Sequence, residues 1–338
     1  AAFSEGTGTT VEYIPFTELS YREQAERIVS GMTLEQKIAQ MITISLRQWD
    51  DTPVTELNEQ QKALLTKYDF GGMILFGQNC TDTEQTVRLT AAIQEAAMAS
   101  EQGIPMLISA DQEGGSIVRL SKGTTTCGNM ELVPFIAVAD EADMIMTAHI
   151  QFPQIETATY TSIDSGEEIS LPATLSKTMI KDILRGDIGY DGVVTTDAML
   201  MDAIDTNFDA IDAAVLAINA DVDILLEPIQ IMSADDIAAQ DEYIGKLVAA
   251  VNDGRIAESE IDDSVVRIIT LKLEKGIIGM EAVNADTAAA AAKTIVGSKE
   301  HHDKELEVAL RTVTLVKNDD NALPLVMQEN EKVAYFYP

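Results

Sequence analysis

Basic residues are scarce in this sequence. Its 338 residues include 23 lysines and arginines against 56 aspartates and glutamates, which gives a formal net charge of −33 at pH 7. Proteins that bind nucleic acid need a basic surface, and so do proteins that dock on anionic lipid. We therefore expect neither kind of partner. The acidity fits a solubilising surface, and it would equally suit an extracellular or salty setting.

Long hydrophobic runs are also missing. No stretch of about 18 apolar residues occurs, so we expect no membrane-spanning segment. The first ten residues, Ala1–Thr10, are small and polar, without the basic start and apolar stretch of a signal peptide. The sequence does not begin with methionine. That start fits either a mature end left after cleavage or an artificial boundary.

Cysteine and histidine are equally sparse. Cys80 and Cys127 are the only cysteines, and they are either unpaired thiols or a disulfide of an exported protein. No cysteine–histidine cluster has metal-ligand spacing, and His301–His302 lies in a polar segment, so we expect no metal site. No G-x-G-x-x-G pattern opens a helix, which leaves a dinucleotide site without support. The sequence thus predicts no cofactor.

What the sequence does contain is an alternation of apolar runs with amphipathic segments. Continuous apolar runs indicate strands buried on both faces, and capping boxes at Thr33–Gln36 and Thr81–Glu84 indicate helix starts. The expected strands are 71–76, 105–111, 142–150, 192–197 and 222–226, and the expected helices are 19–32, one from 33, 81–100, 176–185 and 209–219. The alternation predicts a parallel sheet covered by helices, either a closed (β/α)₈ barrel or an open doubly wound sheet.

Several of these strands end in a polar residue. These residues are Asp111, His149, Asp197 and Glu227. In either architecture the C-terminal ends of the strands form the face where ligands bind. Asp197 could attack the anomeric carbon of a sugar, or it could cap the following helix, which is the commoner role for such a residue. His149 could be a base, a sugar ligand or a hydrogen-bonded structural residue.

An acidic, glycine-rich turn follows the strand that ends at Asp111. The string D-Q-E-G-G spans 111–115, and Arg119 stands eight residues after the aspartate. The two glycines allow a sharp turn and close approach of a ligand, and a guanidinium can hold a sugar or a carboxylate in a fixed fork. The same string also fits a strand that merely ends in an acidic turn.

Several strings, taken together and in order, resemble family 3 glycoside hydrolases. They are MTLEQKIAQM (32–41), GGMILF (71–76), ADQEGGSIVRL (110–120), MTAHI (146–150), PATLS (172–176), LRGDIGYDGVVTTDAMLMDAI (184–204) and SVVRIITLKLEKGI (264–277). TVTLVKNDDNALPL (312–325) is similar to the segment that enters the second, α/β sandwich domain of that family. The DQEGG string resembles the β-N-acetylhexosaminidase branch, because the β-glucosidase branch usually carries histidine where Glu113 stands.

The resemblance implies a (β/α)₈ TIM-type barrel that cleaves glycosides with retention through a covalent intermediate. By position, it makes Asp197 the catalytic nucleophile. Asp111 and Arg119 match positions that contact the sugar, and His149 and Met201 match pocket-lining positions. The resemblance also implies a carbohydrate partner, no cofactor, and a location outside the cell or at the cell envelope.

One part of the family pattern is missing. After Gly128–Met130 the family continues with further strands, a K-H-F-P-G-H-G-like string and the mobile loop that carries a histidine acid/base, whereas here Glu131–Phe135 follows at once. We therefore expect an incomplete barrel that lacks about two strand–helix units, with open edges through which chains could associate. A lost gene segment, an omitted stretch of a longer protein, or completion by another chain would each explain the gap.

The expected organisation is an N-terminal tail (1–18), the barrel domain (19–283, with an internal deletion near 130/131), and a linker with the beginning of a C-terminal α/β sandwich domain (284–338). The expected function is removal of terminal β-linked N-acetylglucosamine from glycans or cell-wall fragments, with impaired activity. The alternatives are a non-catalytic sugar-binding remnant and, less strongly, a β-glucosidase. Cys80 and Cys127 would follow the first two barrel strands on one face, so a disulfide is geometrically possible.

Overall fold

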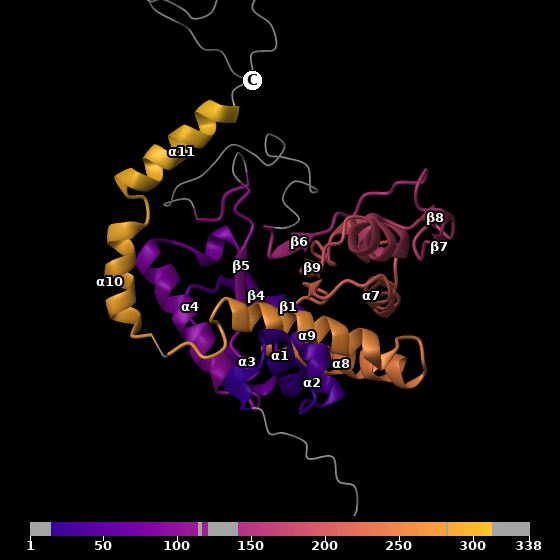
Figure 1. Cartoon of the computed structure of the whole chain (residues 1–338), viewed down its shortest axis with the longest axis horizontal. Coiled ribbons are helices and arrows are strands. Elements are labelled where there is room, and N and C mark those ends of the chain that lie inside the picture. The colour runs from indigo at the N-terminus through magenta and orange to yellow at the C-terminus, as the bar shows by residue number, and fades with distance from the viewer. Residues whose placement is uncertain (1–14, 114–116, 121–140, 282, 313–338) are drawn as a thin grey trace, which may run out of the picture.

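Six short parallel strands form the centre of the computed structural model, which describes residues 15–113, 117–120, 141–281 and 283–312 (Figure 1). They are β1 (Ile42–Ser45), β4 (Gly72–Leu75), β5 (Leu107–Ala110), β6 (Met144–Met146), β9 (Val193–Thr195) and β10 (Leu225–Leu226). Four of them pair in the order β10-β1-β4-β5, and β6 pairs with β9. A parallel bridge between Thr195 and Ile224 joins the two sheets. The spatial order is therefore β5-β4-β1-β10-β9-β6.

This order is that of a barrel with a gap. The first strand, β1, lies beside β10, the last strand along the chain, as closure of a barrel requires. In a doubly wound sheet the first strand would instead lie beside a strand from the middle of the chain. A closed eight-stranded barrel would place further strands between β5 and β6. The protein thus has the expected incomplete TIM-like barrel, and the open doubly wound alternative is excluded.

Helices cover the outer side of these strands (Figure 1). The described helices are α1 (Tyr21–Val29), α2 (Leu34–Gln40), α3 (Glu59–Lys67), α4 (Thr83–Met98), η5 (Thr178–Asp187), α6 (Asp202–Asp205), α7 (Ala210–Asn219), α8 (Ile237–Asn252), α9 (Glu258–Glu274), α10 (Ala285–Ile295) and α11 (Lys299–Thr312). Of these, α11 extends away from the strands (Figure 1). Helix α1 packs on α9, α3 on α4, α2 on α8, and α7 on α8, while α10 lies against α4. Two antiparallel hairpins are inserted, β2–β3 (Gln48–Trp49 with Thr52–Pro53) and β7–β8 (Thr159–Thr161 with Glu168–Ser170).

The helix starts agree with the sequence in one case and differ in another. The capping box at α2 is confirmed, because the backbone N–H of Gln36 donates to Oγ1 of Thr33 at 3.2 Å and the Gln36 side chain accepts from the N–H of Thr33 at 2.9 Å. The box expected from Thr81 is wrong. Asp82 accepts the N–H of Gln85 at 2.9 Å and caps α4, since a carboxylate next to the expected threonine caps at least as well.

Two further expectations changed in extent. The strand expected over 142–150 is paired only over β6, and the helix expected over 176–185 is η5, which has π-helical pitch and runs over Thr178–Asp187. The string that resembles the entry to the sandwich domain lies, from residue 313 onward, outside the described residues. The domain boundaries therefore stay predictions.

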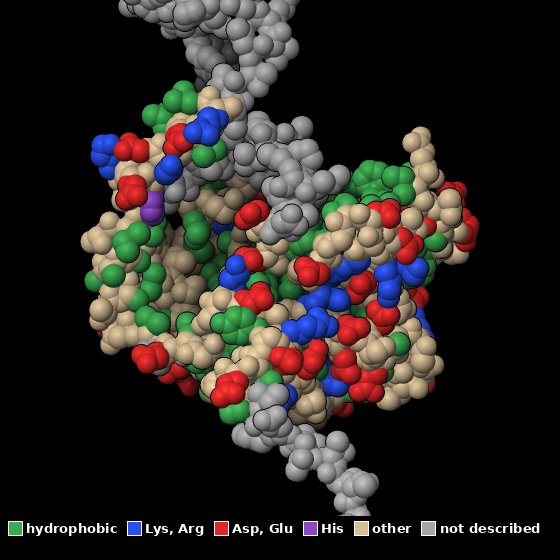
Figure 2. Space-filling model, viewed as in Figure 1, with side chains coloured by type: hydrophobic (Ala, Val, Ile, Leu, Met, Phe, Trp, Pro, Cys, Tyr) green, Lys and Arg blue, Asp and Glu red, His purple; other side chains and the backbone are tan. Residues whose placement is uncertain are grey.

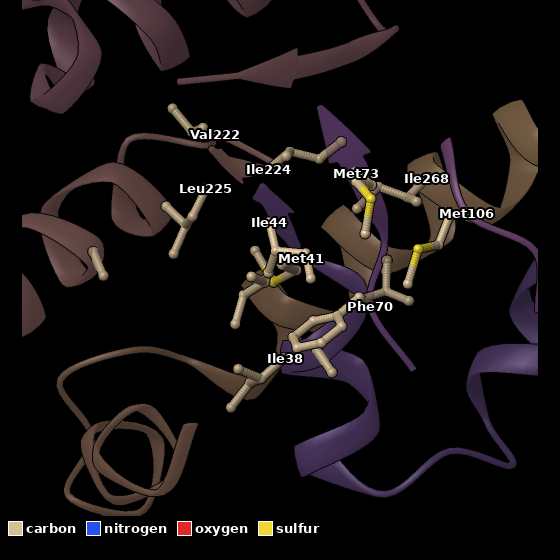
Figure 3. Packing of buried hydrophobic residues seen from close by; sticks show 14 of the residues in the cluster. Ile38, Met41, Ile44, Phe70, Met73, Met106, Val222, Ile224, Leu225 and Ile268 are labelled. Carbon is tan, nitrogen blue, oxygen red and sulfur yellow. The ribbon is translucent and has the colours of Figure 1, made fainter. Parts of the chain in front are cut away.

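The core lies between the strands and the helices. Figure 3 shows buried side chains from the strands meeting those from α2 and α9, among them Ile38, Met41, Ile44, Phe70, Met73, Met106, Val222, Ile224, Leu225 and Ile268. Two glycines let neighbouring backbone segments come this close. A Cβ at Gly71 would lie 1.8 Å from the carbonyl oxygen of Gln40, and one at Gly72 would lie 2.7 Å from that of Leu107. Any larger residue would push the strand away from its neighbours.

The exterior is acidic but contains many ion pairs. Figure 2 shows acidic side chains over the face made by α2, α8 and α9, with basic ones among them. One pair on this face joins Nζ of Lys37 and Oδ1 of Asp262 at 2.6 Å.

None of the described helices is both long and apolar enough to cross a membrane. Cys80 is buried, and burial raises the pKa of its thiol. Cys127, and with it the expected disulfide, lies outside the described residues.

The strand edges β5 and β6 are less covered than the centre of the sheet. Ser109 on β5 is exposed, and Met146 on β6 is 40% exposed, whereas β4 is buried along its whole length. Unpaired strand edges favour pairing with another chain. Self-association through these edges stays a prediction, which light scattering on the purified protein would test.

Lys272 is a fully buried lysine on α9. Its Nζ donates to Oε1 of Gln40 at 2.9 Å, and Gln40 donates to the carbonyl oxygen of Asp69 at 2.6 Å. Burial lowers the pKa of Lys272 from 10.5 to about 7, and the nearby charge of Asp69 only partly opposes this shift. The unfolded chain keeps the ordinary pKa, so it binds more protons than the folded protein between pH 7 and 10.5. The free energy of unfolding therefore increases as the pH rises from 7 to 10.5.

We expect Lys272→Met to stabilise the protein at pH 7 by about 2 kcal/mol in urea unfolding. The lowered pKa means that burying the Lys272 amine costs the folded state about 4–5 kcal/mol at pH 7, and methionine removes this cost. Methionine also leaves Oε1 of Gln40 without its donor, which costs about 1–3 kcal/mol. The gain should shrink towards pH 10. Lys275→Met is the control, because Lys275 is 48% exposed and pairs with Asp143 at 2.6 Å. A Lys272→Met gain of equal size at pH 7 and pH 10 would show that the proton is not the cause.

Candidate active site

The polar residues that follow the strands gather at one face of the barrel. Parallel strands all present their C-terminal ends on the same side, so loops from distant parts of the chain meet there. The side chains placed at this face are Ser45 and Arg47 from β1 and its loop, Phe76 after β4, Asp111 after β5, His149 after β6, Asp197 after β9 and Glu227 after β10.

Asp111 and Arg119 form an ion pair beyond the end of β5. Oδ2 of Asp111 lies 3.3 Å from NH2 of Arg119, and each side chain is 25% exposed. The turn between them is closed by Gln112, whose Oε1 accepts the backbone N–H groups of Arg119 and Leu120, both at 3.0 Å. Nε of Arg119 is buried without a hydrogen-bond partner among the described residues.

A second carboxylate–guanidinium pair lies beyond β10 and β1. Glu227 is 1% exposed, and its two oxygens accept from Nε and NH2 of Arg47 at 3.1 and 2.6 Å, while the hydroxyl of Ser45 also donates to it. The Arg47 guanidinium lies 3.6 Å from the centre of the Phe76 ring, and that of Arg119 lies 5.3 Å from it. A continuous row of charged and aromatic groups therefore crosses the ends of β10, β1, β4 and β5.

The backbone of Glu227 is strained. Its φ is +45°, in the left-handed region that residues other than glycine seldom adopt. Such conformations cost about 1–3 kcal/mol and persist only where the surroundings hold them, often at functional sites. The sequence marked Glu227 as a polar strand end but gave it no role, and Arg47 was missed. An arginine two residues beyond a buried strand was the available signal.

His149 has both ring nitrogens engaged. Nε2 lies 3.0 Å from the carbonyl oxygen of Ala198, so it carries the proton and donates. Nδ1 therefore accepts a hydrogen bond from the Thr174 hydroxyl at 2.9 Å. The Thr174 hydroxyl in turn accepts one from the Thr147 hydroxyl at 3.0 Å. Of the roles left open by the sequence, the hydrogen-bonded structural one describes this geometry. His149 thus holds the carbonyl group of Ala198, the residue after Asp197.

Asp197 sits directly after β9 and is half-buried. Its Oδ1 accepts the backbone N–H of Ala198 at 2.7 Å, and no cation pairs with it in the described part of the chain. It caps no helix, since α6 begins at Asp202 with Met201 as its N-cap. The helix-capping role considered for Asp197 is therefore wrong. The intervening turn leaves the carboxylate at the strand end.

A cavity of about 390 Å³ opens beside this turn. Its walls come from the loops after β1, β4, β9 and β10. The lining residues are Ser45, Arg47, Gln48, Gln78, Ala198, Leu200, Met201, Glu227, Gln230, Ile231 and Met232. Met201 is 45% exposed, consistent with a side chain that a ligand could cover. The size suits one sugar ring with its substituents.

The sequence-predicted residues fall into two groups. Asp111 and Arg119 contact each other, while Asp197 and Met201 lie in the turn after β9, which His149 contacts from the end of β6. In the sheet, β4, β1 and β10 lie between β5 and β9, with neighbouring strands about 4.8 Å apart. The row of Glu227, Arg47 and Phe76 fills that interval, and of these three residues the sequence had marked only Glu227, as a polar strand end.

A histidine acid/base is not available. The chain has three histidines, and two of them, His301 and His302, lie on α11. The third is His149, whose ring nitrogens are both occupied. The candidate site therefore holds the half-buried carboxylate of Asp197 and two arginines, Arg47 and Arg119, but no histidine with a free ring nitrogen.

The pattern of the Glycosyl hydrolase family 3 N terminal domain matches residues 33–132 and 126–271. This chain belongs to glycosyl hydrolase family 3. The two matched stretches of the family 3 chain overlap at 126–132, close to the point where the order of its motifs breaks.

Similar proteins of this family include hexosaminidases. Beta-hexosaminidase A of Pseudoalteromonas piscicida is 26% identical over 397 positions, which cover 83% of this chain and 64% of that protein. The alignment is longer than the 338 residues of this chain, so the relative has residues with no counterpart here. A beta-N-acetylglucosaminidase/beta-glucosidase of Cellulomonas fimi is 25% identical over 200 residues, 59% of this chain and 33% of that protein. The family 3 chain thus spans less than two thirds of these relatives.

Among solved structures, a family 3 beta-N-acetylglucosaminidase from Paenibacillus sp. str. FPU-7 superposes with a TM-score of 0.64. It is 25% identical and the match covers 83% of this chain and 68% of that one. This similarity agrees with the incomplete barrel described above.

Proposed function

We propose that this family 3 chain has the chemistry of a retaining β-N-acetylhexosaminidase, with Asp197 as the nucleophile. The observation that carries the proposal is the position of Asp197, at the end of β9 in a family 3 barrel, half-buried and without a cation partner in the described ranges. The substrates would be terminal β-linked N-acetylglucosamine residues of cell-wall fragments or chitin-like oligosaccharides. The strongly acidic composition is compatible with a setting outside the cell or at its envelope.

In the first step a carboxylate oxygen of Asp197 would attack the anomeric carbon. The bond from that carbon to the leaving-group oxygen breaks, the leaving group takes the electron pair, and a glycosyl ester forms. In the second step water hydrolyses the ester with retention. Asp111 would accept hydrogen bonds from sugar hydroxyls and Arg119 would donate to them. His149 holds the carbonyl of Ala198, the residue whose N–H binds the nucleophile.

The leaving group must depart without a proton from a catalytic histidine. Loss of a general acid/base typically slows such reactions by about 10²–10⁴-fold. We expect p-nitrophenyl β-N-acetylglucosaminide to be hydrolysed feebly. Methyl β-N-acetylglucosaminide should be slower by at least a further factor of about 10⁴, because methoxide is a much poorer leaving group and depends on the general acid. Equal rates on the two substrates would mean that a group in the chain does protonate the leaving oxygen.

The first test is the intact mass of the purified protein together with release of p-nitrophenol. A mass near 36.6 kDa with feeble release is the expected result. A larger mass with fast release would mean that the active protein contains a segment absent from this sequence.

A non-catalytic sugar-binding protein is the second candidate, favoured by the lack of a free histidine at the site. It predicts binding of N-acetylglucosamine in calorimetry with no turnover of any aryl glycoside. A β-glucosidase is weaker still, and faster hydrolysis of the glucoside than of the 2-acetamido glycoside would favour it.

A further inference from the structure

The cavity beside Asp197 combines one fixed cation with an apolar wall. Arg47 is the arginine in its lining, and Leu200, Met201, Ile231 and Met232 supply the apolar side. We propose that Arg47, held in place by Glu227, selects sugars that carry a 2-acetamido group. This inference rests on the proposed hexosaminidase chemistry and assigns its substrate preference to a residue.

Arg47 is held from two sides. Glu227 binds Nε and NH2 in a fork, and the ring of Phe76 lies 3.6 Å from the guanidinium carbon. Glu227 is in turn fixed by Ser45 and by its own burial. NH1 of Arg47 contacts no acceptor among the described residues, and the side chain is 43% exposed. A prepositioned donor therefore faces the cavity with little entropy left to lose on binding.

An acetamido group has the complementary chemistry. Its carbonyl oxygen is a strong acceptor for a guanidinium donor, and its methyl group suits contact with methionine and aliphatic side chains. A glucose hydroxyl at the same position would accept a weaker hydrogen bond and would leave the apolar wall uncovered. Arg47 and the apolar side chains thus match the two halves of this one substituent, while Gln48, Gln78 and Gln230 complete the cavity wall.

The location also fits the position of the group on the sugar. The anomeric carbon must reach Asp197, and the acetamido group is carried by the adjacent ring carbon. Ala198, the residue after Asp197, lines the cavity together with Met201. A sugar placed for attack would therefore direct its 2-substituent into or beside this cavity, where Arg47 lies.

Arg47→Lys tests the inference while keeping a positive charge for Glu227. We expect the ratio of kcat/KM for p-nitrophenyl β-N-acetylglucosaminide over that for p-nitrophenyl β-glucoside to fall by about 10-fold or more, because lysine cannot hold the fork and also donate from a fixed position. The calorimetric affinity for N-acetylglucosamine should fall with it, while that for glucose stays. Arg88→Lys is the control, since Arg88 pairs with Asp286 on the surface and is 49% exposed.

A second variant guards against misfolding. Arg47→Met with Glu227→Gln removes both charges together, so no buried carboxylate is left unpaired, and its circular dichroism spectrum should match that of the wild type. We expect it to lose the 2-acetamido preference more fully than Arg47→Lys. An unchanged preference in both variants, or an equal loss on both glycosides, would overturn the role of Arg47 while leaving the proposed function intact. A wild-type protein that neither hydrolyses nor binds either sugar would refute the proposed function, and this inference with it.

Discussion

Asp197→Asn is expected to lower kcat/KM for p-nitrophenyl β-N-acetylglucosaminide by at least about 10³-fold relative to the wild-type chain, because a neutral amide cannot form the glycosyl ester. The thermal unfolding midpoint should change little. Asparagine keeps the shape of the side chain, and its oxygen can still accept the N–H of Ala198 that lies 2.7 Å from Oδ1. A colorimetric rate assay and a thermal unfolding scan on the same samples check both expectations.

Mass spectrometry makes this test sharper. Since the second step would also lack a histidine base, the glycosyl ester should accumulate on the wild-type protein during turnover and be absent from Asp197→Asn. Asp202→Asn is the matched control, because Asp202 is an exposed acid nearby on α6. Hydrolysis that survives in Asp197→Asn but fails in the control would move the nucleophile elsewhere.

The largest effect on stability is expected at Asp223. This carboxylate is 0% exposed and lies between two arginines, with Oδ2 2.7 Å from NH2 of Arg185 and Oδ1 2.8 Å from Nε of Arg267. Oδ2 also accepts the backbone N–H of Val194 on β9 at 2.7 Å. Asp223→Asn removes the fully buried one of the two carboxylates that Arg185 and Arg267 share, since Asp221 also pairs with both. We expect it to lower the free energy of unfolding by about 3 kcal/mol, the lower end of the range for breaking a buried pair.

Urea unfolding monitored by tryptophan fluorescence and circular dichroism would measure this loss. The control is Asp286→Asn, which removes a pair with Arg88 at 3.0 Å where the two side chains are 49% and 84% exposed. Exposed pairs contribute at most about 1 kcal/mol, so the control should stay close to the wild type. Similar losses in the two variants would mean that burial of the Asp223 cluster does not set its contribution.

Much of the fold could be read from local patterns. The continuous apolar runs that predicted strands reappear as β4, β5, β9 and β10, and Asp209 caps α7 where the sequence placed a helix start. These features depend on residues close together in the chain. Where two neighbouring residues could each cap a helix, the sequence did not distinguish them. At the start of α4 we expected Thr81 to be the cap, but Asp82 caps the helix. The extent of β6 was also overestimated, because strand length depends on the neighbouring strand.

The candidate site could be read only at its ends. Asp111 and Asp197 each lie within a string that resembles a family 3 motif, so the resemblance identified them as candidates. Glu227 and Arg47 lie 180 residues apart in the sequence, and nothing local to either indicates the other. Their pairing follows from β10 lying beside β1 in the closing order of the barrel.

By itself the sequence determined the alternation of strands and helices, the resemblance to family 3, and the lack of any histidine beyond His149, His301 and His302. Composition and local pattern suffice for these. Only the tertiary structure decided that both nitrogens of His149 are occupied, that Glu227 holds Arg47 at a cavity, and that Lys272 is buried with a lowered pKa. Desolvation and hydrogen bonding depend on every element packed around a group, and those elements come together only when the distant strands have paired.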